Sequence, residues 1–177
     1  VEDQASVNEL ATSSDAFDVS ELFSDRDLES GYEAAGASSI TLNGTGAEVS
    51  GSGATADGST VTITAEGVYV LSGEMTDGRI VVDAGEDAKV QLVLEGASVS
   101  SSTGTALYVK SADKVFLTTA EGSFNTLAAT GASTEEDDHT LDGTVFASDD
   151  LTVNGSGSLT VTSAAGSGIV GKDEVTL

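Results

Sequence analysis

Several residue types are missing from this sequence or nearly so. It contains no cysteine, no proline and no tryptophan, and His139 is its single histidine. Without cysteine the chain has no disulfide framework, no thiolate metal site and no cysteine nucleophile. With one histidine and no nucleophile-elbow motif, it also lacks the residues for a His/Cys transition-metal site and for Ser-His catalysis.

Basic residues are scarce, since six Lys and Arg stand against 30 Asp and Glu for a net charge of −24. Such a charge repels phosphate backbones and anionic lipid, so nucleic acid is not an expected partner and cations are. No apolar run approaches the roughly 18 residues of a membrane span, and no signal peptide stands at Val1. We expect no membrane insertion, and an acidic chain without thiols is compatible with an extracellular bacterial protein.

Aromatic residues make up only 5% of the chain, whereas hydrophobic residues reach 38% and glycine occurs 21 times. The core is therefore expected to consist of thin layers of Val, Leu and Ile. Because β-branched residues favour extended backbone and glycine permits tight turns, this composition predicts short strands with frequent turns. A length of 177 residues suits one domain, and we predict a single all-β domain.

A turn motif recurs along the chain, in which Asn or Glu precedes a glycine. The turn glycines are Gly44, Gly67, Gly96, Gly122 and Gly155, with spacings of 23, 29, 26 and 33 residues. Repeats of this length are typical of solenoids, in which each repeat forms one coil. Alternating apolar and polar residues predict about three strands in each coil. These predicted strands cover residues 60–64, 68–71, 79–82, 89–94, 106–109, 114–117, 144–146, 151–153, 158–161 and 168–170.

The chain before the repeats divides into two segments. Residues 1–18 are rich in Ser, Asp, Ala and Glu, which predicts a flexible arm or linker. In residues 19–36, Ser20 can cap a short helical turn, and we expect this N-terminal cap to cover the open first coil. The solenoid is expected over residues 37–177, with its last coil incomplete.

An acidic turn also recurs, between two of the strands of a coil. Measured from the apolar residue that ends each copy, Val90, Val115, Leu151 and Val175, the spacings are 25, 36 and 24 residues. The long step locates an insertion at residues 130–143. This insertion is too polar for a core, so we predict a loop that projects from one corner.

The two motifs together resemble those of the carbohydrate-binding domain-containing proteins, which are secreted bacterial proteins common in clostridia and their relatives. The resemblance is carried by residues 22–28, 82–92, 106–115, 146–161 and 168–175, and it covers nearly everything from Leu22 onward. It implies a right-handed, single-stranded parallel β-helix, similar in shape to pectate lyases, that contains calcium and binds plant polysaccharide without cleaving it. The family usually has a lysine where this chain has Ser148, so a site that depends on that lysine would be missing from this coil.

Carboxylates one coil apart should stack, because a coil of a parallel solenoid rises by about one strand spacing, near 4.8 Å. Negative charges at so short a distance favour a bound cation, and Ca²⁺ takes about six to eight oxygen ligands. The alternative is a solvated acidic corner that keeps the solenoid soluble. The candidate ligands are Asp113, Asp149, Asp150, Asp173 and Glu174 of the turns, with Asp137 and Asp138 of the insertion.

Sugar contacts are expected from aromatic rings with a polar tip. Tyr69 and Tyr108 lie in predicted strands where the alternation allows outward exposure, although packing is the alternative. Lys110 and Lys172 stand beside acidic turns and are also candidate sugar contacts. Charge balance of the acidic corner is the competing explanation for both lysines.

The sequence thus predicts an extracellular or cell-surface protein with a calcium-stabilised β-helix that binds plant cell-wall polysaccharide, acidic types included, without cleaving it. Two alternatives stay open. One is a structural stalk or filament subunit that self-assembles through its arm and its open C-terminal coil. The other is a calcium-dependent polysaccharide lyase. A glycosidase is not excluded by spacing, since paired carboxylates abound in this chain.

Overall fold

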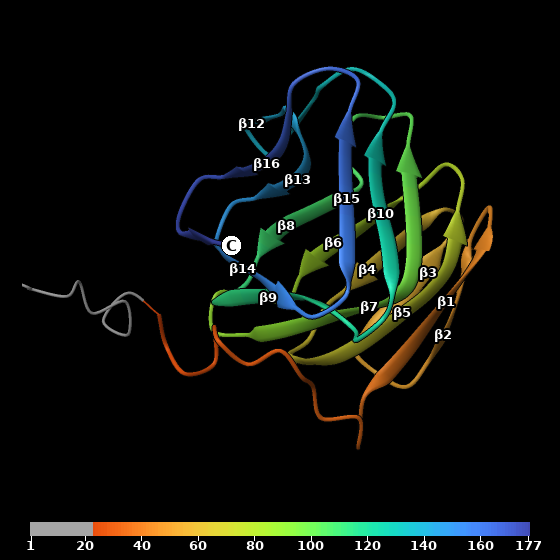
Figure 1. Cartoon of the computed structure of the whole chain (residues 1–177). Helices are drawn as coiled ribbons and strands as arrows, with labels where there is room; N and C mark the ends of the chain where they lie inside the picture. The colour runs from red at the N-terminus through yellow and green to blue at the C-terminus, as the bar shows by residue number, and fades with distance from the viewer. Residues whose placement is uncertain (1–22) are drawn as a thin grey trace, which may run out of the picture.

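The structure, a computed structural model, describes residues 23–177 (Figure 1). In this range the chain forms strands and turns and contains no helix, so none that could cross a membrane. The prediction of an all-β chain is confirmed. The strands are β1 (Ser38–Gly44), β2 (Ala47–Ser50), β3 (Ala54–Asp57), β4 (Thr60–Ile63), β5 (Gly67–Met75), β6 (Arg79–Asp83), β7 (Lys89–Ser101), β8 (Leu107–Ser111), β9 (Lys114–Thr119), β10 (Phe124–Ala129), β11 (Thr134–Glu136), β12 (His139–Leu141), β13 (Gly143–Ala147), β14 (Asp150–Gly155), β15 (Ser158–Ser163), β16 (Ser167–Gly171) and β17 (Val175–Thr176).

Strands one repeat apart in the sequence pair in parallel. One sheet has the order β17-β14-β9-β7-β5-β1-β2, with β10 and β15 branching from β7, and a second has the order β16-β13-β8-β6-β4-β3. Each of these two sheets contains one antiparallel pairing, β1 with β2 in the first and β3 with β4 in the second, so both sheets are mixed. Every strand that the alternation predicted is present, and each begins within one residue of its predicted start. Several strands end later than predicted, most of all β5 and β7.

The core consists of columns of mainly aliphatic side chains that the register builds across neighbouring parallel strands. In one sheet Tyr69, Leu92 and Leu117 lie next to one another on neighbouring strands. In the other sheet Ile80 and Leu107 form a matching column. All five side chains are at most 1% exposed and belong to one cluster. The predicted layers of Val, Leu and Ile are therefore the layers that hold the coils together.

The glycines predicted from the repeat are alike in the sign of their φ angle. All five have positive φ, with values of 90° at Gly44, 149° at Gly67, 75° at Gly96, 70° at Gly122 and 110° at Gly155. Residues with a Cβ rarely adopt such values, which explains why glycine recurs at these positions.

Residues 130–143 differ from the predicted projecting loop. They contain an antiparallel hairpin of β11 and β12, whose turn residues Asp137 and Asp138 have φ values of 50° and 61°. Positive φ at both central residues is typical of a tight hairpin turn that matches the twist of its strands. Leu141 is fully buried and packs with Tyr108 and Phe146, so the hairpin covers part of the outer surface of β8 and β13.

The segment before β1 also differs from its expected place. Arg26 donates to the side chain of Gln91 on β7 at 2.8 Å, and Asp27 forms an ion pair with Lys114 on β9 at 2.8 Å. Residues 23–31 therefore form a strap across β7, β9 and β14, whereas β2 and β3 lie at the edge of the first coil where the cap was expected. The predicted arm 1–18 and the start of the predicted cap lie outside the described residues, and those boundaries stay predictions.

Candidate functional site

The acidic corner at Asp149 and Asp150 binds backbone groups of the neighbouring coils. Asp149 Oδ2 accepts a hydrogen bond from the N–H of Ala112 in the preceding coil at 3.0 Å. Asp150 Oδ1 accepts from the N–H of Glu174 in the following coil at 3.2 Å. The two carboxylates thus connect three successive coils by satisfying turn N–H groups that would otherwise lack a partner.

The other predicted metal ligands do not complete a site. Asp113 forms an exposed ion pair with Lys89 at 3.4 Å, and the Glu174 carboxylate accepts from the Thr176 hydroxyl. Residues 23–177 contain no group of three acidic, histidine or cysteine side chains arranged to hold a metal. The side chains of Asp113, Asp149, Asp150, Asp173 and Glu174 therefore do not fit the predicted calcium ladder as they stand.

Calcium binding stays a prediction that titration can test. If ions occupy the acidic corner, calorimetric titration of chelator-treated protein with CaCl₂ should give saturable heat, and the double variant Asp149→Asn/Asp150→Asn should lose it. Asp57→Asn/Glu66→Asn, which removes two charges elsewhere, should keep it. Equal heats in both variants, or no saturation in the wild-type protein, would remove calcium from the acidic corner.

Five of the predicted residues lie in the hairpin or next to it. Lys110 Nζ lies 3.3 Å from Asp137 and 3.4 Å from Asp83, and these contacts, first with Asp137, raise the pKa of Lys110. Lys172 Nζ lies 5.4 Å from the centre of the Phe146 ring. Asp137 also accepts from the Tyr108 hydroxyl at 3.3 Å. Asp138 occupies the hairpin turn next to this cluster.

Neither predicted tyrosine is placed to stack on a sugar, and this part of the prediction is wrong. Tyr108 does point outward from its strand, but the hairpin covers it and leaves it 0% exposed, and burial raises its pKa. Tyr69 points into the core, where its hydroxyl donates to the carbonyl groups of Gly53 and Ala65. Both rings contribute to packing.

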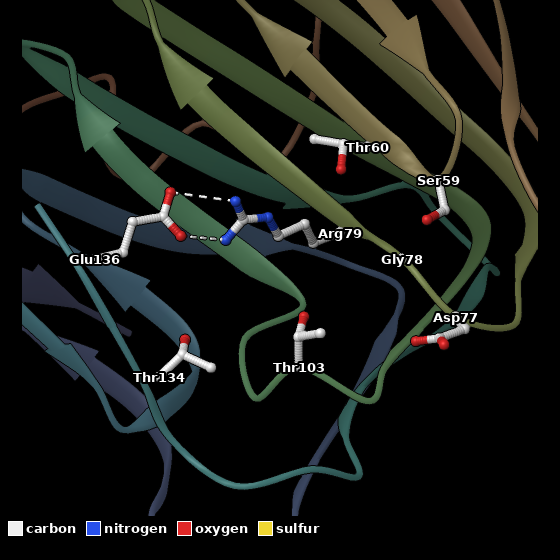
Figure 2. Close-up of a pocket in the computed structure, with 8 residues that line it drawn as sticks. All are labelled: Ser59, Thr60, Asp77, Gly78, Arg79, Thr103, Thr134 and Glu136. Carbon is white, nitrogen blue, oxygen red and sulfur yellow. Dashed lines mark hydrogen bonds and ion pairs between the residues drawn. The ribbon is translucent and has the colours of Figure 1, made fainter.

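A polar cleft lies between the hairpin and the turns that lead into β6 (Figure 2). Its volume is about 370 Å³. Arg79 is the first residue of β6 and Glu136 is the last residue of β11, so the two elements bring together residues 57 positions apart. The remaining lining residues are Ser59, Thr60, Asp77, Gly78, Thr103 and Thr134.

The Arg79 guanidinium and the Glu136 carboxylate form a two-pronged ion pair in this cleft. Nη1 donates to Oε2 at 2.6 Å and Nη2 donates to Oε1 at 3.1 Å, and the side chains are 25% and 32% exposed. A guanidinium has about five N–H donors and a carboxylate about four acceptor positions, so the pair leaves donors and acceptors free for a ligand. Vicinal hydroxyl groups, which donate and accept at once, match this arrangement.

Asp77, the second carboxylate of the cleft, is held as an anion. The backbone N–H and the hydroxyl of Ser102 each donate to it at 2.9 Å, and these hydrogen bonds lower the pKa of Asp77. A glycosidase acid needs a raised pKa so that it still carries a proton at neutral pH. Asp77 does not meet this requirement, and Glu136 is engaged by Arg79.

A model of the carbohydrate-binding domain-containing protein family matches residues 57–177, which include every residue of the cleft. The chain belongs to this family. A carbohydrate-binding domain-containing protein of Acetivibrio thermocellus is 36% identical over 111 residues, which are 62% of this chain and 39% of the relative. This chain therefore spans about two fifths of that protein's length.

A solved structure supports the same relationship. It is described as the polysaccharide lyase-like protein from C. thermocellum, in a gadolinium derivative. The two folds agree with a TM-score of 0.73 at 29% identity, over 78% of this chain and 57% of that one. The family predicted from the repeat and the acidic turns is thus confirmed.

Proposed function

We propose that this member of the family binds polysaccharide without cleaving it and that the Arg79–Glu136 cleft holds the sugar. The observation that carries the proposal is the partly exposed, two-pronged ion pair, which offers fixed donors and acceptors side by side among hydroxyl side chains. Ligand sites commonly use a small number of polar groups fixed in this way to orient what they bind.

We further infer that the paired strands form a single-stranded parallel β-helix. The three strands β14, β15 and β16 pair in parallel with β9, β10 and β13 one coil earlier. In the coil before, the long strand β7 pairs with both β9 and β10, and β8 pairs with β13. The mixed edges at β2 and β3 then belong to the first coil only. The polysaccharide lyase-like solved structure supports this inference.

The charged groups of the cleft support the proposal of binding without cleavage. Asp77 and Glu136 are both engaged as anions, and Arg79 remains a cation in its ion pair. A lyase would need a basic group free to remove a proton, whereas none of the described residues that line the cleft is lysine or histidine, and Arg79 is held in its ion pair. An extracellular location fits a polysaccharide partner and is part of the proposal.

Retention on insoluble cellulose and on cross-linked polygalacturonate tests the proposal. We expect the wild-type protein to be retained on one of these polymers and Arg79→Ala to bind it at least about tenfold more weakly, because a hydrogen bond to a charged group contributes about 1.5–3 kcal/mol. Arg79→Lys should lose much of the affinity as well, since an ammonium cannot make a two-pronged contact.

Lys89→Ala is the matched control, because it removes the same charge from an exposed ion pair outside the cleft. Thermal unfolding should first show that each variant is folded. Equal retention of Arg79→Ala and the wild-type protein would move the site away from the cleft. Release of unsaturated products or new reducing ends from the bound polymer would contradict binding without cleavage.

A further inference from the structure

Phe124, the first residue of β10, is 82% exposed. The other exposed large hydrophobic side chains among the described residues, Leu28 and Leu177, lie outside the strands. A solvent-exposed aromatic side chain on a strand is unusual in a chain whose aromatic content is only 5%. An exposed ring on a regular strand is the kind of group that packs on the apolar face of a ligand.

The backbone that carries Phe124 is fixed by its neighbour Asn125, which is 3% exposed. Asn125 Oδ1 accepts from the N–H groups of Gly96 and Ala97 in the preceding coil, each at 2.9 Å. Asn125 Nδ2 donates to the Ser158 carbonyl in the following coil at 3.0 Å. The ring is therefore presented from a position that three coils hold in place, which limits the entropy lost when a ligand binds.

Small residues surround the ring. Ser158 lies opposite Phe124 on β15, and on β7 Gly96, two residues before the register partner of Thr126, has no side chain and open space around its α-carbon. From Phe124, rows of hydroxyl groups continue along the outer surface, because Ser98, Thr126 and Thr160 occupy matching positions on β7, β10 and β15. We call the outer surface of β7 from Gly96 on, β10 and β15 the neutral face; β10 and β15 lie side by side in Figure 1.

The neutral face contains no charged residue, although the chain carries a net charge of −24. Its nearest charged neighbour in register is Glu74 on β5, opposite Ser98. Glu95 directly precedes Gly96 on β7, and Glu121 stands in the turn before β10. An acidic polymer would meet these carboxylates without a cation to balance them, whereas an uncharged polymer would not.

A protein partner fits this surface less well than a sugar does. A single aromatic side chain buries about 150–250 Å², whereas a stable protein interface needs about 800 Å² on each partner with an apolar centre. Apart from Phe124, the outward residues of the neutral face are Ser, Thr and Ala. Sugar rings combine an apolar face with hydroxyl edges and match both features.

From these observations we infer that Phe124 and the hydroxyl rows of the neutral face form a second sugar-contact surface that takes an uncharged polysaccharide chain. This inference rests on the proposed polysaccharide binding. The outward-facing residues of the second half of β7 start beside Phe124. The strand then ends at the turn that contributes Thr103 to the cleft. A long chain can therefore contact both places, with the ring stacking at one end and the ion pair forming hydrogen bonds at the other.

Affinity electrophoresis in gels that contain hydroxyethylcellulose or polygalacturonate tests this surface. We expect hydroxyethylcellulose to retard the wild-type protein and to retard Phe124→Ser with at least about tenfold lower affinity. Phe124→Trp should bind at least as well as the wild-type protein, because it keeps a larger ring for stacking. Leu28→Ser is the matched control, since it removes another exposed apolar side chain and should leave retardation unchanged.

Each outcome separates this surface from the proposed function. If neither polymer retards the wild-type protein, polysaccharide binding itself is refuted. If hydroxyethylcellulose retards the wild-type protein and Phe124→Ser equally, the cleft proposal stands and the second surface does not exist. Retardation by polygalacturonate alone would overturn the uncharged ligand. A dimer in sedimentation velocity that Phe124→Ser abolishes would show that a second copy of the chain covers the ring.

Discussion

Replacing Asp27 by alanine should lower the free energy of unfolding by about 3 kcal/mol, because the change leaves a largely buried lysine without its partner. The Asp27 side chain is 3% exposed and that of Lys114 is 16% exposed. Asp27 also accepts hydrogen bonds from the Thr152 hydroxyl and from the backbone N–H and hydroxyl of Ser24. One carboxylate thus fastens the strap to β9 and β14.

Urea unfolding followed by far-UV circular dichroism measures this effect. Asp25→Ala is the matched control, since Asp25 is an exposed carboxylate two positions away in the same strap. It should change stability by less than about 0.5 kcal/mol. If Asp27→Ala were as stable as Asp25→Ala, the strap would contribute nothing to the fold.

The contribution of Asp27 should also depend on pH. Burial alone would raise the pKa of Asp27, but hydrogen bonds from Lys114, Thr152 and Ser24 outweigh burial and hold the pKa far below its usual range. A lowered pKa in the folded state means that the stabilisation is complete above the ordinary value of about 3.9 and is lost as the pH falls below it. The stability difference between the wild-type protein and Asp27→Asn should therefore shrink as the pH falls from 5 towards 2.

Replacing Gly155 by alanine should cost about 2–4 kcal/mol, which combines backbone strain with a steric clash. Gly155 has a φ of 110°, which residues with a Cβ rarely adopt. A Cβ at this position would lie 2.3 Å from the carbonyl oxygen and 2.5 Å from the amide nitrogen of Thr119 on β9. Because both atoms belong to the backbone of the preceding coil, the coils would have to separate.

Gly122→Ala separates the two causes. Gly122 also has positive φ, 70°, but a Cβ there would meet nothing within 4 Å. This variant should cost only about 1–2 kcal/mol, the strain alone. Thermal unfolding of the two variants gives the comparison, and equal losses would show that contact between coils at Gly155 is not the reason for its glycine.

Local patterns in the sequence predicted much of the fold. The turn glycines could be found because positive φ selects glycine residue by residue, and the strand alternation could be read because each half-buried strand shows it. The alternation did not predict β10, because the inward positions of this strand include the polar residue Asn125 and its apolar and polar residues therefore do not alternate. Phe124 therefore was not recognised as an exposed strand residue.

The candidate site depended on contacts that no local pattern contains. Arg79 and Glu136 meet only because the hairpin folds back over β8 and β13, and that docking depends on Leu141 and Phe146 packing across the fold. The same docking buries Tyr108, whose outward direction the alternation indicated correctly. A signal was present at Asp137-Asp138, since paired residues of this type favour hairpin turns, but a hairpin alone does not reveal what it covers.

The central claim is that the Arg79–Glu136 cleft holds a polysaccharide intact. Its most direct test is a titration of ¹⁵N-labelled protein with a soluble oligosaccharide of the polymer that retains it, followed by NMR. The account predicts saturable shifts of the amide signals of Arg79, Thr103, Thr134 and Glu136, with no new reducing-end or unsaturated-sugar signals in the same tube. Saturable shifts that leave these four residues unaffected, or the appearance of cleaved sugar, would contradict it.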